Sequence, residues 1–217
     1  MPLKALFLNC TIKYSPEVSN TEALIEKVAG HMRKLGAETE SIRITDYNIA
    51  FGVTSKAVKE GDQWPEVYEK IRACNILVIG MPIWMGVRSS VAQLVIERLD
   101  GSYNDGDPET GQFPLYNKVG GAIVTGNEDG AHDCLSNTLF NLSHFGCTIP
   151  PNSDSYWVGD AGPGPSYIEA GGEKHLYTNK TALYMAHNLV YMAKLLQEHP
   201  IPTSLKALIE EAKAESK

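Results

Sequence analysis

The sequence lacks the features of several large classes of protein. It has no dense run of basic residues and a formal charge of −7 at pH 7, so it does not offer the basic surface that nucleic-acid binding requires. No apolar run reaches the roughly 18 residues of a membrane span. The nearest candidate, residues 76–87, is interrupted by Pro82 and two glycines. The apolar part of the N-terminus is too short for a secretion signal. We therefore expect a cytoplasmic protein with no nucleic-acid or membrane partner.

Cysteine is scarce and dispersed. The four cysteines form no Cys-x-x-Cys motif, and no histidine pair has the spacing of metal ligands. A disulfide framework and a metal site are therefore not expected. The pattern predicts buried thiols in a reducing compartment, at Cys10, Cys74, Cys134 and Cys147.

Two common phosphate-binding signatures are absent as well. The Gly-Lys-Ser/Thr of a Walker loop does not occur, and no Gly-x-Gly-x-x-Gly follows the first apolar run. The composition is otherwise ordinary: 217 residues, 43% hydrophobic and 21% charged, are enough for one full core. We expect one domain over residues 1–200. The tail, 201–217, has the pattern of a short amphipathic helix, with Leu205, Leu208 and Ile209 on its apolar side.

The most informative stretch of the chain is residues 77–90. A short apolar run over 76–79 ends at Gly80, and Pro82 disfavours helix at Met81, which is typical of a strand buried on both faces. A loop with two large side chains, Trp84 and Met85, follows it. Helix then begins at Ser89 or Ser90. In open α/β sheets, ligands bind at such carboxyl ends of strands.

Strands and helices alternate along the rest of the chain. Strands are predicted over 4–9, 38–45, 76–79, 118–125 and 147–149, and helices over 20–35, 63–73, 90–99, 131–144 and 178–196. The alternation predicts an α/β, flavodoxin-like three-layer sandwich around a five-stranded parallel sheet of order 2-1-3-4-5. Three loops, 10–21, 81–89 and 125–131, then meet at the carboxyl edge.

The first of these loops has the character of a phosphate site. Its hydroxyl and amide side chains stand where backbone N–H groups open a helix, an arrangement that binds phosphate. Those side chains are Thr11, Ser19, Asn20 and Thr21, and Lys13 adds a positive charge. The alternative is that Ser19 and Asn20 only cap the helix. If phosphate binds, the missing dinucleotide motif favours a mononucleotide.

Residues 9–21, 81–90 and 125–130 together resemble the three FMN loops of the NADPH-dependent FMN reductases and flavodoxin-like NAD(P)H:quinone oxidoreductases. The resemblance covers about residues 3–196. It implies FMN and NAD(P)H as cofactors and a homodimer or homotetramer. Lys13 stands where many of these proteins have arginine, and the loop over 156–167 has no equivalent in small flavodoxins.

The resemblance also implies a role for each loop. The first would hold the FMN phosphate, through Thr11, Lys13, Ser19, Asn20 and Thr21. The second would lie along the ribityl chain and the isoalloxazine ring, through Pro82, Ile83, Trp84, Met85 and Gly86. The third would lie at the ring edge, through Thr125, Gly126, Asn127 and Gly130.

Four further residues are candidates for parts of the reaction. His132, at the start of a predicted helix, would lie near the ring and give a proton to an acceptor; the alternative is an exposed first-turn histidine. Trp157 or Tyr167 is predicted to line the acceptor pocket. Arg88 would favour the 2′-phosphate of NADPH, although loop arginines are commonly just solvated.

We therefore expect an enzyme that passes a hydride from NAD(P)H through FMN to a quinone, a flavin or a similar small acceptor. The alternative is a flavodoxin-type carrier of single electrons between protein partners, which the acidic charge favours. Three long polar segments, 46–62, 100–117 and 156–167, favour the enzyme, because a carrier needs no substrate pocket. A third possibility is an interaction module that binds no flavin.

Overall fold

The computed structural model describes residues 2–162 and 164–216, so predictions at Met1, Pro163 and Lys217 lie outside the described residues. Five parallel strands form the sheet in the order β2-β1-β3-β5-β6, which confirms the flavodoxin-like order. The strands are β1 (Lys4–Asn9), β2 (Glu38–Arg43), β3 (Ile76–Trp84), β5 (Val119–Gly126) and β6 (Asp154–Val158).

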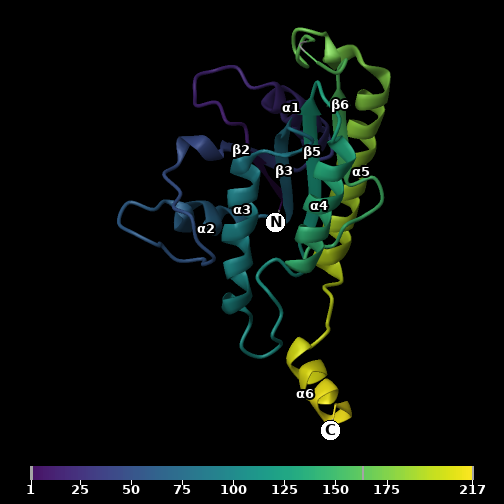
Figure 1. The fold of residues 1–217 in the computed structure, drawn as a ribbon. Helices are drawn as coiled ribbons and strands as arrows, with labels where there is room; N and C mark the ends of the chain where they lie inside the picture. The colour runs from purple at the N-terminus through teal and green to yellow at the C-terminus, as the bar shows by residue number, and fades with distance from the viewer. Residues whose placement is uncertain (1, 163, 217) are drawn as a thin grey trace.

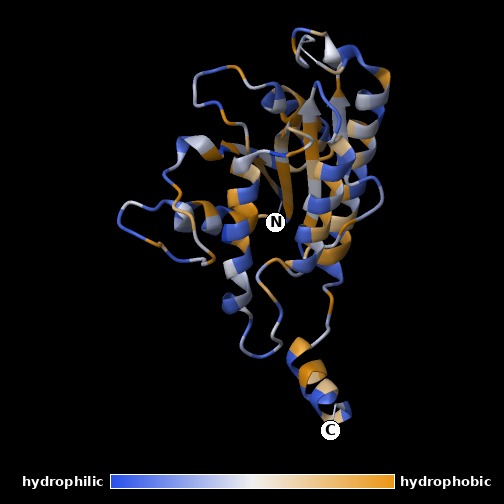
Figure 2. Cartoon of the chain, viewed as in Figure 1, coloured by the Kyte–Doolittle hydropathy of each residue, from blue (hydrophilic) through white to orange (hydrophobic). Residues whose placement is uncertain are grey.

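The helices cover both faces of the sheet (Figure 1). They are α1 (Asn20–Lys34), α2 (Trp64–Ala73), α3 (Ser90–Asp100), α4 (Ala131–His144), α5 (Leu176–Glu198) and α6 (Leu205–Glu215). One core lies between the sheet and α1 with α5, and a second between the sheet and α2, α3 and α4. The central strands are strongly apolar, as Figure 2 shows, because residues of both faces enter a core.

Strand β3 is longer than the sequence predicts and passes through Pro82. Its neighbour β1 ends at the pair Asn9–Gly80, while β5 stays paired as far as Pro82–Thr125. Pro82 therefore lies where one edge of β3 is released from β1, a position that tolerates a missing N–H. The chain then turns back through Met85 (φ 50°) and Gly86 (φ 81°) into β4 (Val87–Arg88). Two positive φ angles in succession are typical of a tight β-hairpin.

The last strand was predicted in the wrong place. Residues 147–149 contribute only an isolated bridge between Thr148 and Val119, and the strand is β6. In β6 the side chains of Ser155 and Trp157 are buried, and that of Tyr156 between them is half-buried. This alternation is typical of a strand. Polar residues in the segment hide it in the sequence. Strand β2 also ends early, because a 3₁₀ turn (Ile44–Asp46) follows Arg43.

All four cysteines are free and buried, as predicted. Within residues 2–162 and 164–216, no helix combines the length and apolar character needed to cross a membrane. In the same ranges, no three side chains of His, Cys, Asp or Glu gather as metal ligands.

A fully buried ion pair fixes the long connection over 46–62. Arg98 of α3 donates to Asp62 at 2.8 Å, and neither side chain is exposed. The same guanidinium donates to the carbonyls of Ala50, Thr54 and Lys56 and lies 5.4 Å from the Trp64 ring. Burial acts to raise the pKa of Asp62, but hydrogen bonds from the Val58 amide, from Arg98 and from two further amides bring it to about 2.

Replacing Arg98 with methionine is expected to lower the free energy of unfolding by about 3–5 kcal/mol, because Asp62 is left as a buried, unpaired charge. Urea denaturation at pH 7 measures the change. The matched control is Lys70→Met, which breaks the exposed pair with Glu40 and costs at most about 1 kcal/mol. Equal losses in the two variants would contradict the assignment of the buried pair as the anchor of this connection.

Candidate functional site

The loop after β1 lies against the first turn of α1. Ser19 caps α1: its Oγ accepts hydrogen bonds from the Glu22 amide at 3.1 Å and from Asn9 Nδ2 at 3.3 Å. The Lys13 ammonium group donates to the Val18 carbonyl at 3.1 Å, so this side chain lies on its own loop. The amides of Asn20 and Thr21 open the helix and have no intrahelical acceptor. Their N–H groups are therefore free to donate hydrogen bonds to an anion at the start of α1.

Two hydrogen bonds tie the first loop to distant segments. The hydroxyls of Thr21 and Thr125 lie 2.9 Å apart in the interior. Asn20 Oδ1 accepts from the Ile168 amide at 2.9 Å, which joins the start of α1 to the segment after β6. The first and third loops therefore meet at the carboxyl edge, as the strand order predicts.

The β3–β4 hairpin is held against the third loop. Met85 at its tip donates its amide hydrogen to Glu128 Oε1 at 3.0 Å. Gly130 has a φ of +122°, and a Cβ atom at this position would overlap the Gly86 carbonyl. Only glycine permits this approach of two backbones. The contact leaves Trp84 about half exposed beside the opening of the site.

A cavity of about 210 Å³ lies between the first loop, the end of β3 and the third loop. Ten of the fourteen predicted cofactor residues line it: Thr11, Lys13, Asn20, Thr21, Pro82, Ile83, Trp84, Thr125, Gly126 and Asn127. The other four predicted residues do not line this cavity. Ser19 caps α1. The remaining three form the contact between the hairpin and the third loop: Met85, Gly86 and Gly130.

The cavity also has walls that the cofactor motifs do not contain. Trp157 and Tyr167, proposed for an acceptor pocket, line it together with Glu128 and Ser166. The Trp157 and Tyr167 rings meet edge to face, with centroids 5.6 Å apart. The alternation in β6 is the sequence signal for Trp157, whereas no local pattern marks Ser166.

The hydroxyl of Tyr167 is buried and has no hydrogen-bond partner within the described part of the chain. Burial, aided by Glu173, raises the pKa of Tyr167 to about 12, so the group is a donor at neutral pH. A buried donor without a partner is costly unless a bound molecule accepts from it. Tyr167 is also one of the residues that line the cavity.

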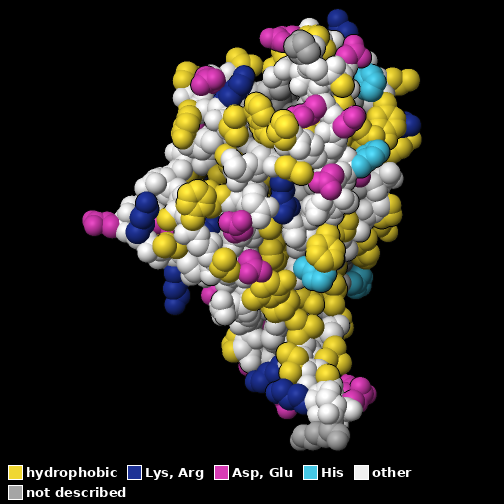
Figure 3. All heavy atoms as spheres, viewed as in Figure 1, with side chains coloured by type: hydrophobic (Ala, Val, Ile, Leu, Met, Phe, Trp, Pro, Cys, Tyr) yellow, Lys and Arg dark blue, Asp and Glu magenta, His cyan; other side chains and the backbone are white. Residues whose placement is uncertain are grey.

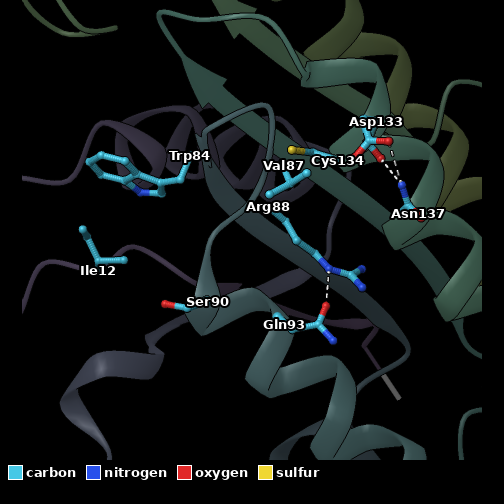
Figure 4. Close-up of a pocket in the computed structure, with 9 residues that line it drawn as sticks. All are labelled: Ile12, Trp84, Val87, Arg88, Ser90, Gln93, Asp133, Cys134 and Asn137. Carbon is cyan, nitrogen blue, oxygen red and sulfur yellow. Dashed lines mark hydrogen bonds between the residues drawn. The ribbon is translucent and has the colours of Figure 1, made fainter.

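A second cavity, of about 650 Å³, opens between α3 and α4 and shares Ile12 and Trp84 with the first. Figure 4 shows Trp84 on one side of it and Arg88 with Gln93 below. Arg88 is held there: it donates to Gln93 Oε1 at 2.8 Å and to Asn141 Oδ1 at 2.6 Å. Burial lowers the pKa of Arg88, but an arginine stays charged at neutral pH.

His132 was predicted to lie near the ring, and the structure places it beside Tyr156 of β6. Its Nε2 lies 3.1 Å from the Tyr156 hydroxyl, and it lines neither cavity. On α4, Asp133, Cys134 and Asn137 face the second cavity, and His132 points away from them, about 100° around the helix from its neighbour Asp133. Hydrogen bonding with Tyr177, followed by burial, raises the pKa of Tyr156 to about 12.

Comparison with known proteins decides the family. A family model described as NADPH-dependent FMN reductase matches residues 4–161. The chain belongs to the NADPH-dependent FMN reductase family. FMN and NAD(P)H are therefore its cofactors.

Relatives within and near this reductase family include flavin enzymes. The chain is 42% identical over 225 residues to 8-demethyl-8-aminoriboflavin-5′-phosphate synthase of Streptomyces davaonensis, covering 100% of this chain and 87% of that protein. It is equally identical, over 212 residues and 94% of its length, to a Mycobacterium bovis protein named divalent metal cation transporter MntH, of which it spans only 31%. A crystal structure of RosB with the bound intermediate 8-demethyl-8-formylriboflavin-5′-phosphate superposes with a TM-score of 0.93 at 41% identity, over 99% of this chain and 88% of that one.

The residues of this reductase fit a flavin mononucleotide on two counts. The open amides at the start of α1 suit a phosphate, and the cavity beside them lies at the topological switch point. The half-exposed indole of Trp84 offers an apolar surface at the opening.

Replacing Tyr167 with phenylalanine is expected to weaken FMN binding by about 10-fold or more, the effect of one lost hydrogen bond of ~1.5 kcal/mol, while the ligand-free protein keeps its stability. Stability is unaffected because the hydroxyl has no protein partner to lose. Flavin fluorescence titration and urea denaturation measure the two quantities. Tyr68→Phe, at a buried tyrosine of α2 that lines neither cavity, is the control. Unchanged FMN affinity in Tyr167→Phe would place this hydroxyl outside the flavin site.

Proposed function

We propose that this reductase uses bound FMN to oxidise NADPH and to reduce a small planar acceptor, a quinone or a flavin. The observation that carries the proposal is the pair of cavities that meet at Trp84 and Ile12. FMN, when bound, supplies the capacity to take up a hydride and to release it to a second molecule. We assign the smaller cavity, where the α1 amides open, to FMN, and the larger one to NADPH and then to the acceptor.

Binding of FMN begins at its phosphate. The Asn20 and Thr21 amides point their N–H groups out of the start of α1, and the helix dipole favours a negative charge there. The buried hydroxyl of Thr11 lies in the same cavity wall, and the Lys13 ammonium group stays close through its bond to Val18. In this assignment Ser19 supports the site indirectly, because it caps the helix whose amides bind the phosphate.

The hairpin orients the ring and the reaction partner. Glu128 and the Gly86–Gly130 contact fix the position of Trp84, so its indole remains between the two cavities. An aromatic wall of this kind suits a planar molecule. Arg88, held by Gln93 and Asn141 in the larger cavity, is placed to pair with the 2′-phosphate of NADPH.

A second candidate function follows from the Streptomyces relative, whose name makes a modified flavin phosphate its product. In that case the flavin phosphate is a substrate that leaves changed, and the same cavity holds it. The two functions differ in the fate of FMN: as a cofactor it is recovered intact after many turnovers, and as a substrate it changes mass. Mass spectrometry of the flavin after prolonged incubation, with NADPH alone and separately with oxygen as oxidant plus an added amino donor, separates them.

The proposed function is tested by anaerobic addition of NADPH to the FMN-loaded protein. We expect the flavin absorbance near 450 nm to be lost within seconds, and steady-state plots with a quinone acceptor to give parallel lines, because one cavity serves donor and acceptor in turn. If neither NADPH nor NADH bleaches the flavin while dithionite gives a long-lived blue semiquinone, the chain is a single-electron carrier and the proposed enzyme activity is wrong.

Preference for NADPH over NADH is expected to depend on Arg88. Replacing it with methionine should raise the KM for NADPH about 10- to 100-fold, the range for loss of a charged hydrogen bond, and leave the KM for NADH within about twofold. Arg72→Met, at an exposed arginine paired with Glu69 on α2, is the control. A parallel rise for both nucleotides would show that Arg88 does not read the 2′-phosphate.

A further inference from the structure

A short segment after β6, residues 164–172, closes one side of the smaller cavity. Ser166 and Tyr167 line the cavity, whereas the next three residues are exposed on the other side of the segment. The segment lies at the end of the sheet to which the arrows of β5 and β6 point (Figure 1). Charged and hydrophobic side chains both reach the surface at this end of the molecule (Figure 3). The segment is therefore a single layer of chain between the cavity and solvent.

Two asparagine side chains, from different loops, hold this segment against the cavity. Asn20, at the start of α1, accepts a hydrogen bond from the Ile168 amide through Oδ1 at 2.9 Å. Asn127, in the third loop, donates from Nδ2 to the Gly164 carbonyl at 2.8 Å. Both asparagines also line the cavity. One end of each side-chain amide is thus bonded to the segment rather than left for a ligand.

The segment has a glycine near each end and a fixed point beyond the second glycine. Gly171 has a φ of +65°, a conformation that glycine adopts without strain, and Gly164 stands at the other end. Just after Gly171, the Lys27 ammonium group donates to the Glu173 carbonyl and so ties the chain to α1. The part that can move therefore lies between Gly164 and Gly171.

Packing and hydrogen bonding at Tyr167 have opposite effects on the closed arrangement. The Tyr167 ring is 2% exposed and meets the Trp157 ring edge to face, which favours closure. Its hydroxyl is buried with no hydrogen-bond partner in the described part of the chain, which opposes closure. Because these two effects offset each other, the bonds from Asn20 and Asn127 make a direct difference to how often the segment opens.

The cavity in its closed form is small for a flavin mononucleotide. Its volume is about 210 Å³, whereas sites for ligands of drug size have roughly 300–1,000 Å³. The walls from β3 and β5 are fixed, because these strands are paired with each other and with their neighbours. The 164–172 segment, held by two side-chain hydrogen bonds, is the wall that can yield.

We propose that residues 164–172 form a lid over the smaller cavity and that the side chains of Asn20 and Asn127 latch it, so that these asparagines set how fast FMN enters and leaves. This inference rests on the assignment of FMN to that cavity in the proposed function. Opening of the lid admits FMN, and re-formation of the same two bonds retains it. Both asparagine side chains are positioning groups, because they act on FMN through the lid.

Stopped-flow flavin fluorescence tests the latches through the rate constants of FMN association and dissociation. We expect Asn20→Ala and Asn127→Ala each to raise both rate constants about 2- to 12-fold, the range for one hydrogen bond, and to leave the dissociation constant within about threefold. Entry and release speed up together because the bond is lost from the free and the bound protein alike.

The matched control is Asn188→Ala, at an asparagine of α5 that donates to the Pro151 carbonyl at 2.7 Å and lines neither cavity. Both rate constants should stay at the wild-type values in this variant. If the two cavity variants raise only the dissociation rate constant, and the dissociation constant rises with it, the asparagines bind FMN directly and the proposal is wrong.

Hydrogen exchange in the ligand-free protein tests the lid without any flavin. Peptides that cover residues 164–172 should exchange about 2- to 12-fold faster in Asn20→Ala and Asn127→Ala, and peptides of β5 should be unchanged. Unchanged exchange over 164–172 overturns the latches whatever FMN does. Faster exchange together with a wild-type protein that does not bind FMN overturns instead the assignment of FMN to this cavity, on which the inference rests.

Discussion

The parallel pairing of β1, β3 and β5 is the constraint on which the rest of the site depends. Because these strands are neighbours and point the same way, the loops that follow them emerge at one edge. The Thr21–Thr125 hydrogen bond then joins the first loop to the third, and the contact of Gly130 with Gly86 joins the third to the hairpin. The two cavities are the spaces that remain between segments fixed in this way.

Much of this arrangement could be predicted from the sequence, for identifiable reasons. Right-handed crossovers and regular alternation of apolar strands with amphipathic helices leave few possible strand orders, so the sheet order was predicted correctly. Most residues of the first and third loops were placed at the cavity for the same reason, since a loop position follows from the strand that precedes it.

The errors occurred where tertiary contacts override local pattern. Pro82 is typically a strand breaker, but here it lies beyond the end of β1, where β3 needs no N–H on that edge. Arg98 has no assigned role in the sequence analysis, and only the fold shows that it is buried against Asp62. For His132 the helix start was predicted correctly, but the direction of the side chain depends on the helix phase relative to β6, which brings it to Tyr156.

The family of this protein and its electron acceptor are supported by different observations. The family and its cofactors follow from the match over residues 4–161, whereas the assignment of the acceptor to the second cavity beside Trp84 is our proposal. Outside the site, α6 has no buried residue, and Tyr177, Tyr184 and Tyr191 of α5 are exposed.

The central claim is that the start of α1 binds the FMN phosphate in the cavity beside Trp84. Calorimetric titration of the ligand-free protein with FMN and with riboflavin tests it most directly, because the two flavins differ only in the phosphate. We predict that FMN binds at least about 100-fold more tightly, corresponding to two charge-assisted hydrogen bonds of ~1.5 kcal/mol each, and that Thr11→Val with Thr21→Val narrows this difference. Equal affinity for FMN and riboflavin would contradict the account.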